Sequence, residues 1–273
     1  MTEIRLERVS HVYRDGGVRA LDEVDLAIAR GEAVALVGEN GSGKTTLVQH
    51  LNGLLRPTTG RVVIDGLDAA KRTVAQLAAR VGLAFQDPHR QLFAGRVRAE
   101  VEFGPRNLGM RGSRLAAAAD AALAAVGLSD RGATNPYDLG LSERKLLAIA
   151  SVLAMQTDAV VLDEPTAGQD LPGVERVRSV VTTLRDAGRT LVAISHDMEF
   201  VAEHFDRVVV MRGGRIALDG SAEIVFGRGS WVTLAESGIE PPAAARLGDE
   251  LGLGSTPTDA ALTAALARRS AAQ

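Results

Sequence analysis

Residues 38–45 read Gly-Glu-Asn-Gly-Ser-Gly-Lys-Thr and fit the phosphate-binding pattern G-x-x-x-x-G-K-[ST]. Glycines in such a loop let backbone N–H groups close around phosphate oxygens at the N-terminus of a helix. Lys44 is expected to reach the terminal phosphates of a nucleotide, and the Thr45 hydroxyl to hold Mg²⁺. The residues expected to bind nucleotide are Gly38, Asn40, Gly41, Ser42, Gly43, Lys44, Thr45 and Thr46.

The segments on either side of this loop are of the types that must position it. Residues 33–37 are a continuous apolar run typical of a buried strand, and residues 46–51 begin a helix. A glycine-rich turn that matches the pattern by chance is the alternative, and this strand and helix argue against it. The motif predicts binding of a nucleoside triphosphate and leaves open what the energy is used for.

A second pattern places two carboxylates at the end of a strand. Residues 160–165 read Val-Val-Leu-Asp-Glu-Pro, in which Asp163 is expected to hold Mg²⁺, directly or through water. Glu164 is expected to orient and deprotonate the attacking water. The alternative is that these acids only cap a strand, a pattern that is common without a phosphate-binding loop.

Two further polar residues, Gln86 and His196, follow predicted strands at residues 81–85 and 190–194. Ligands of α/β proteins bind at such strand ends. Taken alone, Gln86 would be a solvated side chain and His196 a structural one. Their value lies in their order along the chain.

Composition limits the function classes. A chain of 273 residues with 46% hydrophobic content can form one large α/β domain with an appendage. The net charge of −3 implies no broad basic face, so nucleic acid is not an expected partner. The absence of cysteine excludes disulfides and is compatible with a reducing cytoplasm. We expect no signal peptide and no membrane-spanning segment, so any link to a membrane runs through a partner.

The order of these motifs resembles the nucleotide-binding domain of ABC transporters over residues 3–220. The elements that carry the resemblance are the P-loop, Gln86, a helical insert, Asp163-Glu164, Asp170 and His196. It implies an α/β P-loop NTPase fold, with a RecA-like core, an antiparallel β subdomain and a helical subdomain at about 97–154. Residues 221–273 are expected to form a small helical C-terminal extension.

The resemblance also implies roles for single residues. Tyr13 would stack on adenine, although an exposed strand aromatic is the alternative. Gln86 would sense Mg²⁺ and the membrane partner, and His196 would contact the γ-phosphate. Residues 166–170 would form the D-loop between two subunits, in which Asp170 binds nucleotide and the family more often has leucine in place of Gln169.

Two segments are similar to the ATPases of energy-coupling factor (ECF) transporters, the cobalt and vitamin importers. They are residues 85–109, with Phe85-Gln86-Asp87-Pro88 at their start, and a tail with Leu234, Gly238, Pro241-Pro242 and Leu247. In those importers a membrane T component couples two ATPases to a substrate-binding S component, and the tail resembles an ATPase dimerisation segment.

The similarity implies a chain on the cytoplasmic face of the membrane, held through residues around 86–109, with Arg96 and Glu100 at the surface. A helix that contacts another kind of membrane partner is the alternative.

One motif departs from the family pattern. The ABC signature is usually Leu-Ser-Gly-Gly-Gln, and residues 139–143 read Leu-Gly-Leu-Ser-Glu. Leu141 adds bulk and Glu143 a negative charge near a phosphate, which Arg144 and Lys145 are expected to offset. Ser142 is expected to stand in partly for the missing hydroxyl and so to contact nucleotide.

Each ATP site of the family uses the Walker residues of one chain and the signature of the other. A heterodimer with a second ABC ATPase of regular signature is therefore favoured, and a homodimer stays open.

These observations predict an ATP- and Mg²⁺-dependent ATPase subunit that energises import of a micronutrient within an ECF-type transporter. The alternatives are an ATPase of another ABC transporter and a weakly hydrolysing regulatory subunit. A soluble ABC protein of DNA repair or translation is disfavoured by the charge and by the presence of a single cassette.

Overall fold

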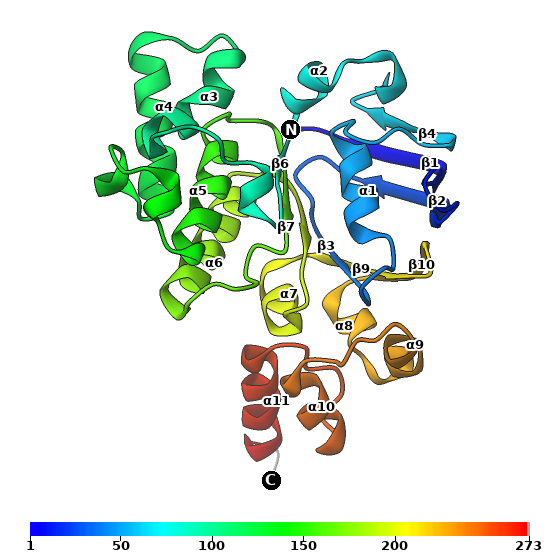
Figure 1. Cartoon of the computed structure of the whole chain (residues 1–273). Helices are drawn as coiled ribbons and strands as arrows, with labels where there is room; N and C mark the ends of the chain where they lie inside the picture. Colours follow the sequence, from blue (N-terminus) through cyan, green and yellow to red (C-terminus); the bar gives the residue numbers. More distant parts are fainter. Residues whose placement is uncertain (272–273) are drawn as a thin grey trace.

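The computed structural model describes residues 1–271 and arranges them in two sheets with helices around them (Figure 1). The larger sheet has the strand order β10-β9-β3-β8-β7-β6. All of its strands run parallel except β10, which pairs antiparallel with β9 at one edge. The bounds are β3 Ala33–Val37, β6 Val81–Ala84, β7 Ala159–Asp163, β8 Thr190–Ile194, β9 Arg207–Arg212 and β10 Arg215–Gly220.

The smaller sheet is antiparallel, in the order β2-β1-β4-β5, and packs beside the helix that follows the P-loop. Its strands are β1 Ile4–Val12, β2 Arg19–Ile28, β4 Thr59–Ile64 and β5 Leu67–Asp68. The helices on this side are α1 Lys44–Leu51 and α2 Val74–Ala78. The turn between β1 and β2 brings Tyr13 next to α1, which matters for the site below.

Helices on the other side of the larger sheet come from an insert and from two crossover connections. The insert lies between β6 and β7, which are neighbours in the sheet, so the sheet continues across it. The insert helices are α3 Val97–Asn107, α4 Gly112–Ala125 and α5 Leu141–Leu153, and the crossover helices are α6 Leu171–Asp186 and α7 Met198–His204.

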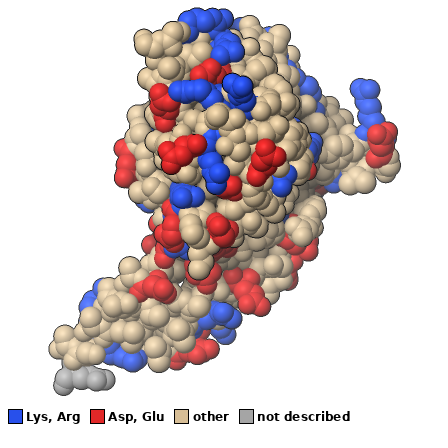
Figure 2. Space-filling view, turned by 60° about the vertical axis from the view of Figure 1, so that its left-hand side comes forward, with Lys and Arg blue, Asp and Glu red and all other residues tan. Residues whose placement is uncertain are grey.

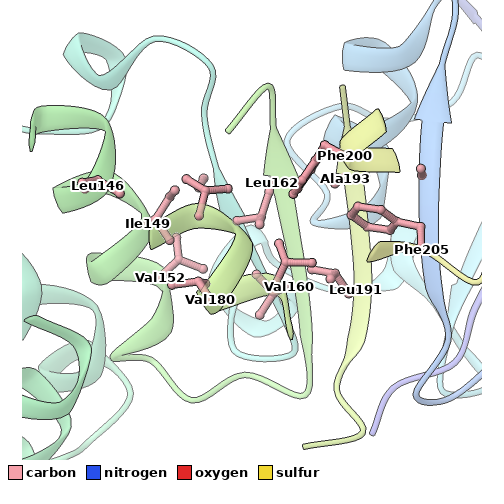
Figure 3. Close-up of a cluster of buried hydrophobic side chains, with 14 of the residues drawn as sticks. Leu146, Ile149, Val152, Val160, Leu162, Val180, Leu191, Ala193, Phe200 and Phe205 are labelled. Atoms are coloured by element: carbon pink, nitrogen blue, oxygen red, sulfur yellow. The ribbon is translucent and has the colours of Figure 1, made fainter. Parts of the chain in front are cut away.

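Side chains of the larger sheet point alternately into two apolar cores, because successive residues of a strand face opposite sides. Val160 and Leu162 of β7 pack toward α5 and α6, where Ile149 and Val180 are buried (Figure 3). Val161 between them belongs to the second core, with β1 and α1. Burial on both faces is the reason that these strands are continuously apolar in sequence.

The C-terminal helices form a small group at one end of the molecule (Figure 1). They are α8 Ala222–Val225, α9 Trp231–Glu236, α10 Ala243–Glu250 and α11 Asp259–Ala271. Residues 272–273 of the predicted extension lie outside the described part of the chain. On the face shown in Figure 2, acidic and basic side chains are interspersed. The α/β architecture and the helices between β6 and β7 agree with the sequence predictions, and β9 and β10 form a hairpin at Gly213-Gly214.

Candidate nucleotide-binding site

The loop at residues 38–43 joins β3 to α1 and is shaped by close backbone approaches. Gly43 is the N-cap of α1, with φ of 105°, and no side chain caps the helix. A Cβ at Gly43 would lie 2.4 Å from the Ala20 carbonyl oxygen, and one at Gly38 would lie 2.3 Å from that of Met211. Only glycine fits at both positions. No side chain caps the N–H groups of the first turn of α1, and uncapped N–H groups at a helix N-terminus suit an anion.

Lys44 is 6% exposed and turns back into this loop. Its ammonium donates to the carbonyl oxygens of Gly38 at 2.7 Å and Glu39 at 2.9 Å. Burial lowers the pKa of Lys44, and the carboxylates of Glu164 and Asp163 act against this shift. The loop thus holds a buried cation close to two acidic groups, in the place where a triphosphate would meet it.

Side chains from both sheets line one pocket in front of the loop. The lining residues are Tyr13, Val18, Ala20, Asn40, Gly41, Gly43, Lys44, Thr45, Thr46, Gln86, Glu164, Ile194 and His196. Gly38 and Ser42 lie behind it in the loop, and Asp163 is buried next to Glu164. The structure therefore gathers most of the predicted site residues, while Ser142 and Asp170 do not line this pocket.

Sequence reasoning missed the apolar part of the lining. Val18 is 60% exposed, and its carbonyl oxygen accepts the Tyr13 N–H at 2.9 Å. The signal in the sequence was a valine directly after the glycine pair Gly16-Gly17 and five residues after Tyr13. The pair offers an apolar surface of the kind that a nucleobase contacts.

Tyr13 is more than an exposed strand aromatic. Its hydroxyl lies 3.0 Å from Oγ1 of Thr46, in the first turn of α1. Its ring packs edge to face with the His11 ring, with 4.7 Å between the ring centroids. The side chain is thus held against the P-loop helix and faces the pocket. Stacking on adenine stays a prediction.

Asp163 and Glu164, where β7 ends, are each 5% exposed. Oδ1 of Asp163 is buried and has no hydrogen-bond partner among the described residues. Burial, reinforced by the Glu164 charge, raises the pKa of Asp163 to about 6, while Thr45 and Lys44 act against this. A bare carboxylate oxygen in this setting is costly unless a cation meets it. Carboxylate and hydroxyl oxygens are the ligands that Mg²⁺ prefers, so these residues fit Mg²⁺.

Glu164 and His196 form a close pair at the pocket, with 3.1 Å between Oε1 of Glu164 and Nε2 of His196. Glu164 has φ of 51°, a left-handed conformation that costs a non-glycine residue roughly 1 kcal/mol and clusters at functional sites. Burial raises the pKa of Glu164 and lowers that of His196. A carboxylate with a raised pKa is better suited to accept a proton from water.

The variant signature, residues 139–143, lies at the start of α5. Gly140 is the N-cap of this helix, and Leu141 is 49% exposed. The Glu143 carboxylate accepts the Gly140 N–H at 3.2 Å and pairs with Arg131 at 3.3 Å. The first turn of α5 thus carries no hydroxyl at its N-cap.

Neither Arg144 nor Lys145, the residues expected to offset the charge of Glu143, pairs with it directly. Arg144 contacts the His89 ring at 3.3 Å, and the Lys145 ammonium donates to the Ala167 carbonyl at 2.5 Å. A helix side chain at i+1 or i+2 points away from residue i, so both basic groups reach other segments. Arg131, in the 3₁₀ turn Ser129–Arg131, takes their place.

The expectation that Glu100 is a surface residue is also wrong. Glu100 is 3% exposed, and its carboxylate accepts the N–H groups of Phe93 at 2.9 Å and Ala94 at 2.7 Å. These amides lie in the irregular segment before α3, and the Glu100 carboxylate is the acceptor that satisfies them. Arg96 is exposed, as expected.

The chain is similar to known ATP-binding proteins in sequence and in fold. The family described as ABC transporter matches residues 21–167. The energy-coupling factor transporter ATP-binding protein EcfA2 of Symbiobacterium thermophilum is 42% identical over 257 residues, covering 91% of this chain and 88% of that protein. The cobalt import ATP-binding protein CbiO of Rhodobacter capsulatus is 42% identical over 229 residues, covering 83% of this chain and 81% of that protein.

A solved structure has the same architecture. It is cbiO1 from Clostridium perfringens, part of the ABC transporter complex cbiONQ, with a TM-score of 0.74 and 32% identity. The match covers 91% of this chain and 98% of that one. Some curated relatives are longer: the chain spans 40% of the length of an ABC transporter ATP-binding protein of Methanosarcina acetivorans, at 41% identity over 91% of this chain.

Proposed function

The chain belongs to the ABC transporter family of ATP-binding proteins, and from this premise we propose that its ATPase activity energises uptake of a micronutrient within an ECF-type transporter. The predicted family, the P-loop α/β fold and the ATPase class are confirmed by these matches. Relatives that are 42% identical and are named for energy-coupling factor transport and cobalt import support a vitamin or a transition metal ion as cargo.

The Glu164–His196 pair in the P-loop pocket is the main support for the proposal that this chain hydrolyses ATP. A water between Glu164 and the γ-phosphate would lose its proton to the carboxylate as it attacks the phosphorus in line. His196, kept neutral by its lowered pKa, would contact the γ-phosphate. Lys44 and the N–H groups at the start of α1 would stabilise the charge that moves onto the leaving phosphate oxygens.

Thr45, Gln86 and Asp163 are the residues that would hold Mg²⁺. The unpartnered Oδ1 of Asp163 and the position of Thr45 and Gln86 in the pocket support this assignment. Bound Mg²⁺ neutralises phosphate charge. A bound cation would also favour the negative charge of the Asp163 carboxylate, so Asp163 would be ionised at neutral pH.

A second ABC ATPase is the proposed partner across the signature and the D-loop. The N-cap of α5 is Gly140, which has no hydroxyl, and exposed Leu141 follows it where the family has glycine. The site completed by this signature would hydrolyse slowly, while the site on Lys44 would be fast with a regular partner signature. We therefore propose a heterodimer, with a homodimer as the alternative outcome of the signature test below.

No helix within residues 1–271 is long and apolar enough to cross a membrane. We propose that a membrane T component holds the chain at the cytoplasmic face, and that a separate S component binds the cargo.

The docking surface that we propose for the T component is a groove of about 370 Å³ lined by α2, α3, α5 and β6. Phe93 and Phe103 line it, are 59% and 47% exposed, and meet edge to face at 4.7 Å. Exposed aromatic pairs beside a groove are typical of interaction surfaces.

Copurification tests this transporter assignment. Phe103→Asp should lower recovery of the membrane proteins with the tagged chain about tenfold or more, because it places a charge in an apolar contact. ATP binding should not change, since Phe103 does not line the nucleotide pocket. Val232→Asp is the matched control, because Val232 is 72% exposed on α9. A chain that binds no membrane protein in its native host would exclude the transporter function.

A weakly hydrolysing regulatory subunit is the second candidate. The exposed Leu141 and the absence of a hydroxyl on Gly140 favour it. The turnover number of the purified complex separates the two, because a regulatory subunit binds ATP without sustained phosphate release.

A further inference from the structure

Two departures from the family pattern touch each other in the structure. Ser142 stands where the signature has glycine, and Gln169 where the D-loop more often has leucine. Oγ of Ser142 lies 2.5 Å from Oε1 of Gln169 and 2.8 Å from Oδ1 of Asp170.

We propose that Ser142 and Gln169 are a positioning pair that ties the first turn of α5 to residues 166–170, so that the two segments act as one unit. This inference rests on the proposed function, in which both segments complete the nucleotide site of a second ATPase. The pair touches neither the nucleotide pocket of this chain nor its lining.

The donor proton of the Ser142 hydroxyl is engaged within the chain. A hydroxyl has one proton, which Ser142 shares between an amide oxygen and a carboxylate as a three-centre bond. Hydrogen bonds to an ionised carboxylate are roughly twice as strong as neutral ones. The hydroxyl is therefore committed to the D-loop, which revises its predicted role as a stand-in for the missing signature hydroxyl at Gly140.

Gln169 links this tie to the D-loop itself. Its N–H donates to the Thr166 carbonyl at 3.2 Å, and its side-chain amide donates to the Pro165 carbonyl at 3.3 Å. One side chain thus closes the loop on itself and contacts α5. Lys145, three residues after Ser142 on the same helix face, adds a second link to the Ala167 carbonyl.

The space for this pair depends on glycine at position 173. A Cβ at Gly173 would lie 2.4 Å from Oε1 of Gln169 and 2.5 Å from Oγ of Ser142. The Gly173 N–H also donates to Oδ1 of Asp170 at 2.9 Å, as part of the N-cap of α6. Serine at 142, glutamine at 169 and glycine at 173 therefore fit one another sterically and by hydrogen bonding. Leucine at 169 could not accept the Ser142 proton.

The Ser142–Gln169 pair would order the signature and D-loop before they complete the nucleotide site of the partner ATPase. A D-loop and a signature that are joined before the subunits close lose less conformational freedom on closure. A single hydrogen bond of this kind corresponds to about 2–10-fold in an equilibrium constant. Loss of the tie should therefore slow turnover without affecting nucleotide binding to this chain's own P-loop.

Hydrogen exchange of the nucleotide-free full chain tests the tie without any ATPase assay. Ser142→Ala and Gln169→Leu should each speed amide exchange at residues 141–145 and 166–173 about 2–10-fold. Ser142→Thr, which keeps the hydroxyl, should retain protection. Ser113→Ala is the matched control, because Ser113 is also the second residue of its helix and is exposed. Unchanged exchange in both Ser142→Ala and Gln169→Leu would overturn the proposal.

Steady-state turnover of the complete transporter tests the function of the pair. Ser142→Ala and Gln169→Leu should each lower kcat about 2–10-fold, and the double variant should lose no more than the larger single loss. Multiplying losses would show two independent residues and overturn the pair. A loss in Ser142→Ala with a gain in Gln169→Leu would show a hydroxyl that acts on phosphate, and would overturn it too. If Glu164→Gln leaves turnover unchanged, the proposed function fails, and the exchange experiment still decides whether the tie exists.

Discussion

Replacing Asp163 with asparagine is predicted to stabilise the nucleotide-free protein at alkaline pH. Asp163 is 5% exposed, and its Oδ1 has no partner among the described residues. Burial raises the pKa of this carboxyl from 3.8 to about 6. Because the folded pKa is higher than the unfolded one, ionisation costs stability. The cost is absent below about pH 4 and complete above about pH 7.

The magnitude follows from the two pKa values. The difference between 3.8 and about 6 corresponds to about 3 kcal/mol of unfolding free energy, at about 1.36 kcal/mol per pKa unit. Asparagine has the shape of the aspartic acid and no charge, so it avoids this cost. Its amide still carries a buried polar group, which makes about 3 kcal/mol an upper bound.

Urea unfolding of the purified chain in EDTA checks this prediction. The gain of Asp163→Asn over wild type should be largest near pH 8, about half as large near pH 5, and absent below about pH 4. Adding Mg²⁺ and ATP should reverse the order, because the variant loses a ligand of the cation. Asp130→Asn, at an exposed carboxylate, is the control. A variant that is no more stable than wild type near pH 8 would refute the reasoning. So would a variant whose gain is the same near pH 8 and below about pH 4.

Three further predictions concern ATP and turnover. Gly238→Ala should weaken ATP binding several-fold in a nucleotide titration. Gly238 has φ of 68°, a Cβ there would lie 3.1 Å from the Cβ of Glu39 in the P-loop, and the Glu39 N–H donates to the Ser237 carbonyl. Unchanged affinity would mean that the tail does not shape the P-loop. Tyr13→Ala should weaken ATP binding about tenfold and Tyr13→Phe much less, because base stacking needs the ring and not the hydroxyl; equal losses would assign the effect to the bond with Thr46. Changing Gly140 to Ser, Leu141 to Gly and Glu143 to Gln, with Ser142 kept for its bond to Gln169, should raise phosphate release by the complex. No gain, with equal losses from Lys44→Ala and the matching change in the partner, would favour a homodimer.

Local and strand-end features could be read from the sequence because they depend on residues close together in the chain. The P-loop glycines, the apolar strand before Asp163 and the β9–β10 hairpin follow from local pattern alone. Their assembly around one pocket follows from the common edge of a parallel sheet, where Gln86, Glu164 and His196 lie.

Contacts between distant segments could not be read in the same way. The partner of Glu143 is Arg131, which a turn outside the helix brings near, and no spacing rule predicts it. Glu100 looks like a surface acid, yet the amides of Phe93 and Ala94 draw it inward. Burial of a charged residue depends on where unpaired backbone groups occur, which periodicity does not reveal.

Hydrolysis of ATP through Glu164 is the step by which we propose that this chain drives uptake. The most direct test measures phosphate release and nucleotide binding by the complete transporter in lipid, with wild-type chain and with Glu164→Gln. We predict that ATP binding is retained and that phosphate release falls roughly 10²–10⁴-fold, as expected for loss of a general base, with uptake lost alongside. Unchanged phosphate release by Glu164→Gln would contradict this account.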